Sequence, residues 1–284
     1  MKIGIGLPNQ VRDVRADVIP AWAKKAEEAG FASLGTIGRI AYPGVMDTVA
    51  LAAAAGATST IGLVSTVMLT PVWPSTLIGK ELAGIQGVSG GRLTVGIGVG
   101  GRPDDFVVDG LGEKGTGKRL NSAVEEWRGL WSGEKVHGGD NVGVPGGSID
   151  VPLLFGGFVP AAMDRIAKYG QGHVSPAMPP EQLSQIFGGV RAAWQEHGRE
   201  GSPRFVVISY FGLTDLEKGQ DNERHYYAFG GPEYAEQVAG GILGSADALK
   251  ATLKAYEGIG TDELILHPST DNLDEIARLA DIVL

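Results

Sequence analysis

Glycines crowd the end of one short apolar run, where a strand would be expected to turn into a helix. Residues 89–106 read SGGRLTVGIGVGGRPDDF. Four glycines in this run lack the side chains that would block a flat, wide group such as a ring system. They are Gly96, Gly98, Gly100 and Gly101. The alternative is that they only permit strand curvature and close helix packing. The run does not match a dinucleotide-binding fingerprint, because a charged RPDD loop rather than a helix is expected to follow it.

A second glycine-rich turn could bind an anion. The stretch LLFGGFVPAAMDRIAKYG reads as a strand, two glycines and the start of a helix. After Gly156 and Gly157, the backbone N–H groups of Phe158 and Val159 could meet an anion at the positive end of the helix dipole. Pro160 in the first helical turn is pre-organised for the helix but has no N–H to donate. The alternative is a tight strand-to-helix turn without a ligand.

Short apolar runs alternate with helical patterns along most of the chain. Runs that are apolar throughout are typical of parallel strands that are buried on both faces. Eight such runs with helices between them predict an α/β fold, the (β/α)8 or TIM barrel, in preference to a doubly wound sheet. The predicted strands lie within 3–7, 31–37, 61–69, 92–99, 151–157, 172–176, 204–212 and 262–268.

The predicted barrel forms a single domain, residues 1–284, because such a barrel needs roughly 250 residues. The segment 213–245 is too long for a plain connection after the seventh strand. We expect this inserted segment to add helices over the barrel mouth. Active sites of TIM barrels lie at the C-terminal ends of the strands, so both glycine-rich turns are predicted to lie on one face.

Charge and composition argue against several classes of function. The chain has 24 basic and 33 acidic residues, a formal charge of −9, so no nucleic acid and no anionic membrane is expected as a partner. No apolar run approaches the roughly 18 residues of a membrane span, and MKIGIGLPNQ lacks a signal-peptide pattern, which predicts a cytoplasmic protein. There is no cysteine, and the five histidines lack HxxxH or HxH spacing, so neither a disulfide nor a metal site is expected.

Several stretches spread over nearly the whole chain resemble a known family. They include GIGLPN, the run from DTVALAAAAGAT to GRLTVGIGVGG, VEEWRGLWSG, VPLLFGG, IAKYGQGH and GTDELIL. In these stretches the sequence is similar to the luciferase-like flavin-dependent oxidoreductases and monooxygenases, the family of bacterial luciferase. The resemblance implies a TIM barrel that holds FMN or the deazaflavin coenzyme F420 across its C-terminal mouth. The glycines would then make room for the ring, and the FGGFVP turn would take the phosphate.

The resemblance also implies particular cofactor contacts. Family members often have a non-proline cis peptide at the end of the third strand, which maps to residues 67–69 and puts Thr66 and Met68 near the ring. The backbone amides that hold the phosphate in bacterial luciferase map to Phe158 and Val159.

One charge of the family's phosphate site is missing from this chain. The arginine that follows the fourth strand in bacterial luciferase maps to Val99. Arg102, three residues later, could supply the charge, or it could pair with Asp104 or Asp105 as an ordinary loop ion pair. Val99 and Arg102 are therefore predicted cofactor contacts, together with the glycines on either side of Val99.

The family's usual base is also missing, at the end of the second strand. Where many members read WVGDHL this chain reads GTIGRI, so Gly38 takes the aspartate position and Arg39 the histidine position. An arginine stays charged, so Arg39 is predicted to stabilise an anion or orient a substrate. The family's YGDGW reads YGQGH here, and the titratable ring of His173 could take over the proton transfer. The alternative is that His173 only forms hydrogen bonds with its neighbours.

Aromatic residues are predicted to line the substrate side of the site. Tyr42 and Tyr210 are candidate substrate contacts, as phenolic donors or as apolar walls with a polar tip. The stretch ERHYYAFGG, within the insertion 217–241, is predicted to form part of the substrate wall. Its aromatic content favours an organic substrate of modest polarity.

The resemblance implies two possible reactions. With reduced FMN an oxygen atom is inserted into a small organic substrate, and with F420 a hydride passes to or from one. Either reaction needs a supplier of reduced cofactor, a flavin or F420 reductase. Because Gly38 and Arg39 replace the usual pair, the alternative is a non-catalytic flavin-binding or structural subunit. The resemblance further implies a homodimer, for which TVALAAAAGAT offers a small-residue face. The alternative is that this face only packs on its own barrel.

Overall fold

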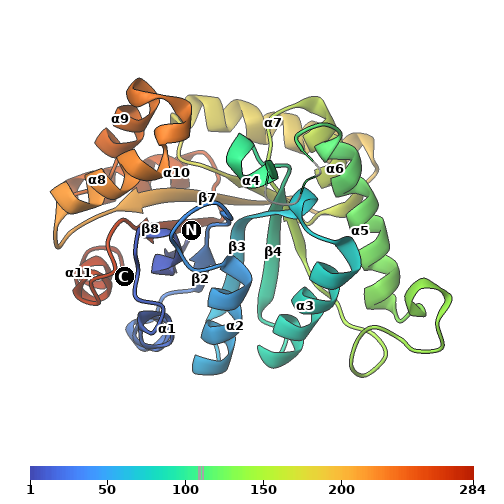
Figure 1. Cartoon of the computed structure of the whole chain (residues 1–284). Helices are drawn as coiled ribbons and strands as arrows, with labels where there is room; N and C mark the ends of the chain where they lie inside the picture. Colours follow the sequence, from blue (N-terminus) through green and yellow to red (C-terminus); the bar gives the residue numbers. More distant parts are fainter. Residues whose placement is uncertain (108–109, 111) are drawn as a thin grey trace.

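The computed structural model of the chain describes residues 1–107, 110 and 112–284, and it contains a closed barrel of eight parallel strands (Figure 1). The strands are hydrogen-bonded in sequence order, from β1 to β8 and back to β1. The predicted TIM barrel is therefore confirmed. The strands are β1 Lys2–Gly6, β2 Ser33–Thr36, β3 Gly62–Leu69, β4 Leu93–Gly98, β5 Leu153–Phe155, β6 Gly172–Ser175, β7 Arg204–Phe211 and β8 Glu263–Pro268.

Helices follow the strands and surround the barrel (Figure 1). One difference from the sequence prediction concerns the charged segment after β4, which forms the short helix α4 instead of a loop. The α-helices are α1 Val18–Ala29, α2 Asp47–Ala57, α3 Ser75–Val88, α4 Pro103–Val107, α5 Thr116–Ser132, α6 Pro160–Tyr169, α7 Pro180–Glu196, α8 Leu216–Tyr226, α9 Pro232–Gly240, α10 Ala246–Gly258 and α11 Asp274–Val283. Short 3-10 turns are η1 Pro8–Gln10, η2 Thr70–Val72, η3 Val136–Gly138 and η4 Ala228–Gly230.

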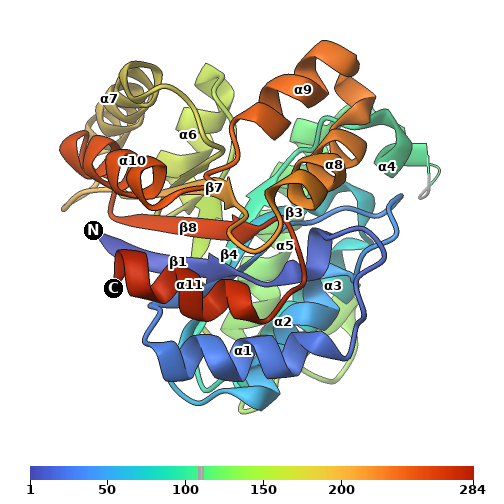
Figure 2. The ribbon, with the colours of Figure 1, turned by 90° about the vertical axis from the view of Figure 1, so that its left-hand side faces the viewer.

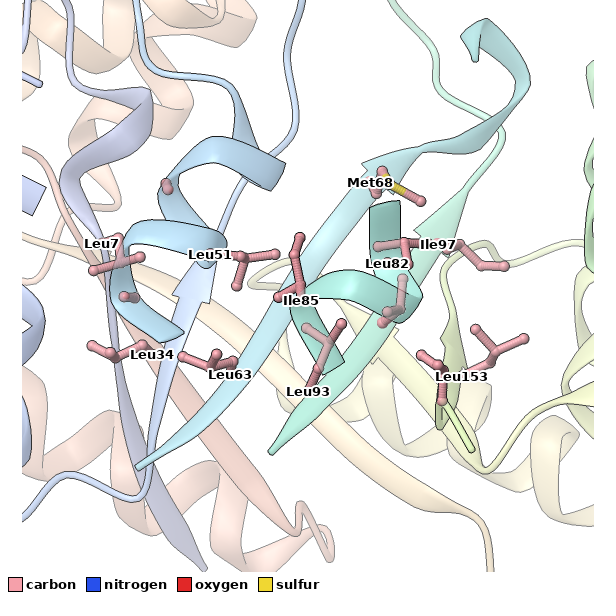
Figure 3. Close-up of a cluster of buried hydrophobic side chains, with 14 of the residues drawn as sticks. Leu7, Leu34, Leu51, Leu63, Met68, Leu82, Ile85, Leu93, Ile97 and Leu153 are labelled. Atoms are coloured by element: carbon pink, nitrogen blue, oxygen red, sulfur yellow. The ribbon is translucent and has the colours of Figure 1, made fainter. Parts of the chain in front are cut away.

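Two layers of apolar side chains form the core. Between the strands and the outer helices, side chains such as Leu63, Leu93 and Leu82 pack together (Figure 3). Inside the barrel, a second cluster includes Val64 and Val206 from facing strands. Because successive strand residues point to opposite faces, a strand that is covered on both sides must be apolar throughout. This packing explains the continuous apolar runs that predict the strands.

The segment 213–245 contains α8, η4 and α9, as expected from its length. Figure 2 shows α8, α9 and α4 grouped at the end of the barrel to which the strand arrows point. The segment returns to the barrel where the amide of Leu243 donates to the carbonyl of Tyr210 over 2.9 Å. These helices therefore stand over the C-terminal mouth. Within residues 1–107, 110 and 112–284, no helix has the length and apolar character needed to cross a membrane.

Candidate functional site

A cavity of about 330 Å³ opens at the C-terminal ends of the strands. This volume lies at the lower end of the roughly 300–1,000 Å³ of small-molecule sites. The loops after β2 to β7 contribute to it, and the insertion closes one side. The lining residues are Ile37, Gly38, Thr66, Val67, Leu69, Gly98, Val99, Gly100, Gly101, Arg102, Gly156, Gly157, Phe158, Val174, Ser175, Pro176, Ile208, Tyr210, Tyr227, Phe229 and Tyr234.

Glycines keep the strand ends at this cavity free of side chains. A Cβ atom on Gly98 would lie 2.9 Å from Cγ2 of Val67, and one on Gly100 would lie 2.8 Å from the ring of Phe106. Gly157 has φ +116°, a conformation that L side chains rarely adopt. Close approach of the backbone at the cavity wall therefore requires glycine at these positions.

The end of β3 contains the one cis peptide bond of the described chain, between Thr66 and Val67. It lies at the start of the predicted interval, around residues 67–69, since Val67 is one of its two residues. Thr66 lines the cavity, and its Oγ1 donates to the carbonyl of Thr36 over 2.9 Å. Met68 does not line the cavity. It is 1 % exposed and packs in the outer core near Leu82 and Ile97 (Figure 3).

The turn from β5 into α6 has the features of an anion site. Phe158 lines the cavity, while Val159 lies beside it at the N-cap of α6 and is exposed. Neither backbone amide has a hydrogen-bond partner among the described residues. Both amides precede Pro160 at the start of a ten-residue helix, where the dipole favours negative charge.

His173 forms a hydrogen bond to this turn. Its ring is fully buried, and Nε2 lies 3.0 Å from the carbonyl oxygen of Gly157, to which it donates. Burial lowers the pKa of His173 to about 4, so the ring is neutral at pH 7. His173 is not among the residues that line the cavity. The geometry thus connects it to the turn and not directly to a ligand.

Arg39 also lies outside the cavity lining. Its Nη1 donates to the carbonyl of Tyr226 over 2.7 Å, and its Nη2 donates to Asp104 over 2.6 Å. The guanidinium also lies 4.8 Å from the ring centroid of Tyr42. These contacts join the loop after β2 to α4 and α8. Arg39 thereby binds the carboxylate of Asp104, one of the two that were considered as partners of Arg102.

Arg102 lines the cavity and rests on aromatic rings of the insertion. Its guanidinium carbon lies 4.7 Å from the ring centroid of Tyr226 and 5.0 Å from that of Phe229. No carboxylate lies within ion-pair distance of it in the described part of the chain. Asp105 instead accepts hydrogen bonds from the amides of Ile40 and Ala41, each over 2.9 Å. The alternative, an ordinary loop ion pair of Arg102 with Asp104 or Asp105, is therefore not formed among the described residues.

The two predicted substrate tyrosines have different surroundings. Tyr210 lines the cavity, and its hydroxyl lies 2.8 Å from that of Tyr227. Burial raises the pKa of both phenols well above 10, so they stay protonated and can donate hydrogen bonds. Tyr42 does not line the cavity, and it packs edge-on against Tyr226 with ring centroids 4.9 Å apart.

Two buried carboxyl groups near the site were not identified from the sequence. Asp47 lies beneath Gly38, where a Cβ atom would come within 2.8 Å of Oδ2 of Asp47. Burial raises the pKa of Asp47 to about 6. Glu223 on α8 is 2 % exposed, and burial raises its pKa to about 8. An acidic residue on the apolar face of a helix is the only signal that the sequence gives for either group.

Comparison with protein families gives a match over most of the chain. The model of the luciferase-like monooxygenase family matches residues 1–263. Among curated proteins, an uncharacterized protein of Mycobacterium tuberculosis is 28% identical over 221 residues, which cover 68% of this chain and 76% of that protein. An uncharacterized protein of Mycobacterium bovis matches with the same values.

Solved structures with the same fold include enzymes that use different cofactors. An F420-dependent secondary alcohol dehydrogenase aligns with a TM-score of 0.81 and 17% identity over 100% of this chain and 98% of its own. A monooxygenase from Streptomyces bottropensis aligns with a TM-score of 0.79 and 22% identity over 99% of this chain and 97% of its own. The FMN-bound oxygenating constituent of 3,6-diketocamphane monooxygenase from Pseudomonas putida aligns with a TM-score of 0.76 and 16% identity over 99% of this chain and 95% of its own. At these identities the likeness is one of fold.

Proposed function

The chain belongs to the luciferase-like monooxygenase family, and from that premise we propose that it is an oxidoreductase. It uses reduced FMN or F420, bound at the C-terminal mouth of the barrel, to oxygenate or reduce a small organic substrate. The observation that carries this proposal is the cavity itself. Glycines line its walls at the ends of β4 and β5, and backbone amides that have no partner in the described part of the chain lie at its edge.

The residues of the site fit such a cofactor. Gly98 and Gly156 leave the strand ends bare, which suits a flat ring. The amides of Phe158 and Val159 are donors without a partner among the described residues, and they lie at a helix N-terminus, which suits a phosphate. When bound, the cofactor supplies the redox chemistry, hydride transfer or oxygen activation.

The protein groups have roles of binding, orientation and shelter. His173 positions the phosphate turn through its hydrogen bond to Gly157. Tyr210 and Tyr227 offer protonated hydroxyls to a polar atom of the substrate, and Phe229 and Tyr234 exclude water from one side. A reductase supplies the reduced cofactor from outside.

The proposal extends to assembly and location. The small-residue helix α2 provides a face for a homodimer, and the chain acts in the cytoplasm. Size-exclusion chromatography with light scattering tests the dimer. A monomer at micromolar concentration contradicts it.

A second candidate is a non-catalytic flavin-binding or structural subunit. It is favoured by Gly38 and Arg39 at the family's aspartate and histidine positions, since Arg39 is engaged by Asp104 and the carbonyl of Tyr226. Binding without turnover for any reduced cofactor and substrate would support this candidate.

The first experiment is a titration with FMN, riboflavin and F420, followed by fluorescence. In the variant Val159→Pro, one amide donor is removed from the turn while the exposed side chain loses little packing. The φ of −85° at Val159 is close to the value that proline needs. Because a hydrogen bond to a charged group contributes about 1.5–3 kcal/mol, we expect FMN to bind at least about tenfold more weakly.

The control variant is Val159→Ala, which keeps the amide. It should bind FMN like the wild type, and riboflavin should bind equally to both variants. If neither FMN nor F420 binds the wild type at millimolar concentration, the proposed oxidoreductase activity is wrong.

A further inference from the structure

A buried carboxyl group on α8 has no role in the proposed reaction. Glu223 is 2 % exposed, and its Oε2 has no hydrogen-bond partner in the part of the chain that the structure describes. It lies one helical turn before Tyr226 and Tyr227, on the face of α8 that packs over the barrel mouth. Burying an ionised carboxylate without a partner would lower the stability of the fold. The protonation state of Glu223 is therefore a candidate for a function.

The cation whose charge acts on Glu223 is Arg102, which belongs to the cavity wall. The positive charge of Arg102 acts on Glu223 and opposes the effect of burial on its pKa. The guanidinium lies over the ring of Tyr226, and its buried Nε has no hydrogen-bond partner in residues 1–107, 110 and 112–284. Arg39, the other arginine of the site, is already neutralised by Asp104. Of the described residues that line the cavity, Arg102 is therefore the one whose positive charge is available to a ligand.

Other charged or titratable groups around Glu223 do not compete for this role. Asp105 is occupied by two backbone amides of the loop after β2. The surrounding phenols stay protonated because burial raises their pKa values. These phenols belong to Tyr42, Tyr210, Tyr226 and Tyr227. The segment after β8 adds the uncharged hydroxyl of Ser269.

The surroundings of Arg102 indicate what kind of ligand group it meets. The rings that it contacts, Tyr226, Tyr227 and Phe229, follow β7, whereas the amides proposed for the cofactor phosphate follow β5. Aromatic side chains form this wall of the cavity together with Tyr234. Aromatic walls with a single cation suit a planar ring that carries one negative charge.

We propose that the substrate is an aromatic anion, such as a carboxylate, whose charged group binds Arg102, and that Glu223 permits this binding only while its own carboxyl is protonated. This inference rests on the proposed function, because it names the substrate of the same cavity. Glu223 is a positioning residue, since it acts through Arg102 and does not line the cavity.

The pH range follows from the buried state of Glu223. Burial raises its pKa to about 8, so the carboxyl is neutral at pH 7 and Arg102 keeps its full charge for the ligand. Above this pKa the ionised carboxyl of Glu223 adds a negative charge near Arg102, beyond ion-pair distance, and so weakens the attraction of Arg102 for the ligand anion. If the ionised state of Glu223 and the binding of the anion to Arg102 exclude each other, the affinity for the anion falls about tenfold for each pH unit above the pKa of Glu223.

Calorimetry with a pair of matched probes tests the proposal on the full chain. Benzoate carries the charge, benzamide is its neutral analogue, and neither titrates between about pH 7 and about pH 9. We expect benzoate to bind at least about tenfold more tightly than benzamide at about pH 7. We expect that preference to fall about tenfold by about pH 9.

Two variants assign the effect to the named residues. Arg102→Gln should abolish the preference for benzoate, whereas Arg128→Gln, on the exposed face of α5, should retain it. Glu223→Gln imitates the protonated carboxyl, so it should bind benzoate equally at both pH values. Glu217→Gln, which is exposed on the same helix, should keep the wild-type pH dependence.

Several results would overturn the inference. Equal binding of benzoate and benzamide to the wild type contradicts the anionic substrate, and an unchanged pH profile in Glu223→Gln contradicts the role of Glu223. If Arg102→Gln instead removes the advantage of FMN over riboflavin, the anion is the cofactor phosphate and the substrate assignment is wrong. Failure of the proposed function appears separately, as absence of flavin and F420 binding in the wild type.

Discussion

At the scale of single residues, glycines at the barrel mouth have two separable roles. A Cβ atom on Gly96 would lie 2.2 Å from the carbonyl oxygen of Ser65, so this glycine is required by the packing of adjacent strands. A Cβ atom on Gly156 would lie 3.5 Å from Val67 and 3.7 Å from the carbonyl of Val174, which are ordinary contacts. Gly156 therefore tolerates a methyl group in the protein itself, and that methyl group would stand where the cofactor ring is proposed to lie.

Substituting each glycine with alanine tests this distinction. Gly96→Ala should lower the free energy of unfolding by about 3 kcal/mol, because the backbone at Ser65 cannot yield easily. Gly156→Ala should leave stability within about 0.5 kcal/mol of the wild type and weaken FMN or F420 binding about tenfold. Urea denaturation and cofactor titration measure the two effects. Full cofactor affinity in Gly156→Ala would show that the ring does not approach β5.

At the scale of elements, Arg39 connects three segments that are far apart in sequence. It joins the loop after β2 to Asp104 on α4 and to the last carbonyl of α8, at Tyr226. Its side chain is 9% exposed, whereas that of Asp104 is 42% exposed. The buried hydrogen bond to α8 should therefore contribute more than the partly solvated ion pair.

Removal of Arg39 should loosen the insertion without unfolding the barrel. In Arg39→Ala the carbonyl of Tyr226 loses its donor, and we expect amides of residues 224–231 to exchange hydrogen about tenfold faster or more. Asp104→Asn should have a smaller effect. Arg15→Ala, which removes a side chain that is 80% exposed and its ion pair with Asp17, is the control and should leave exchange unchanged. Equal exchange in Arg39→Ala and the control would contradict a connecting role of Arg39.

At the scale of the whole molecule, the barrel could be predicted because its signal is local. Each buried parallel strand is an apolar run, and such runs can be counted along the chain. The site could be predicted only where it follows strand ends, as at Thr66, Gly98 and Phe158. The contact from Arg39 to Tyr226 spans 187 residues and depends on the path of the insertion. No local pattern indicates that path, so Glu223 was missed and the sequence left open whether Arg102 pairs with a loop carboxylate.

Among the described residues, four buried groups with pKa shifts of opposite sign govern how stability changes between about pH 4.5 and about pH 8. Burial lowers the pKa of His173 to about 4 and that of His267 to about 3, so each costs stability as the pH falls below the ordinary histidine value of about 6.5. Burial raises the pKa of Asp47 to about 6 and that of Glu223 to about 8, so each adds stability as the pH falls through these values. Between about pH 4.5 and about pH 6 the two pairs oppose each other.

We therefore expect the free energy of unfolding to be nearly constant over this range and to decline as the pH rises from about 6.5 to about 8, where Glu223 alone titrates. His267→Asn removes one destabilising group, so its stability should rise as the pH falls from about 6 to about 4.5, by about 1 kcal/mol per pH unit. Glu223→Gln should show the opposite slope. Urea denaturation at several pH values measures these slopes, which are independent of any constant loss from the altered packing. Parallel curves for both variants and the wild type would mean that neither group is held uncharged by the fold.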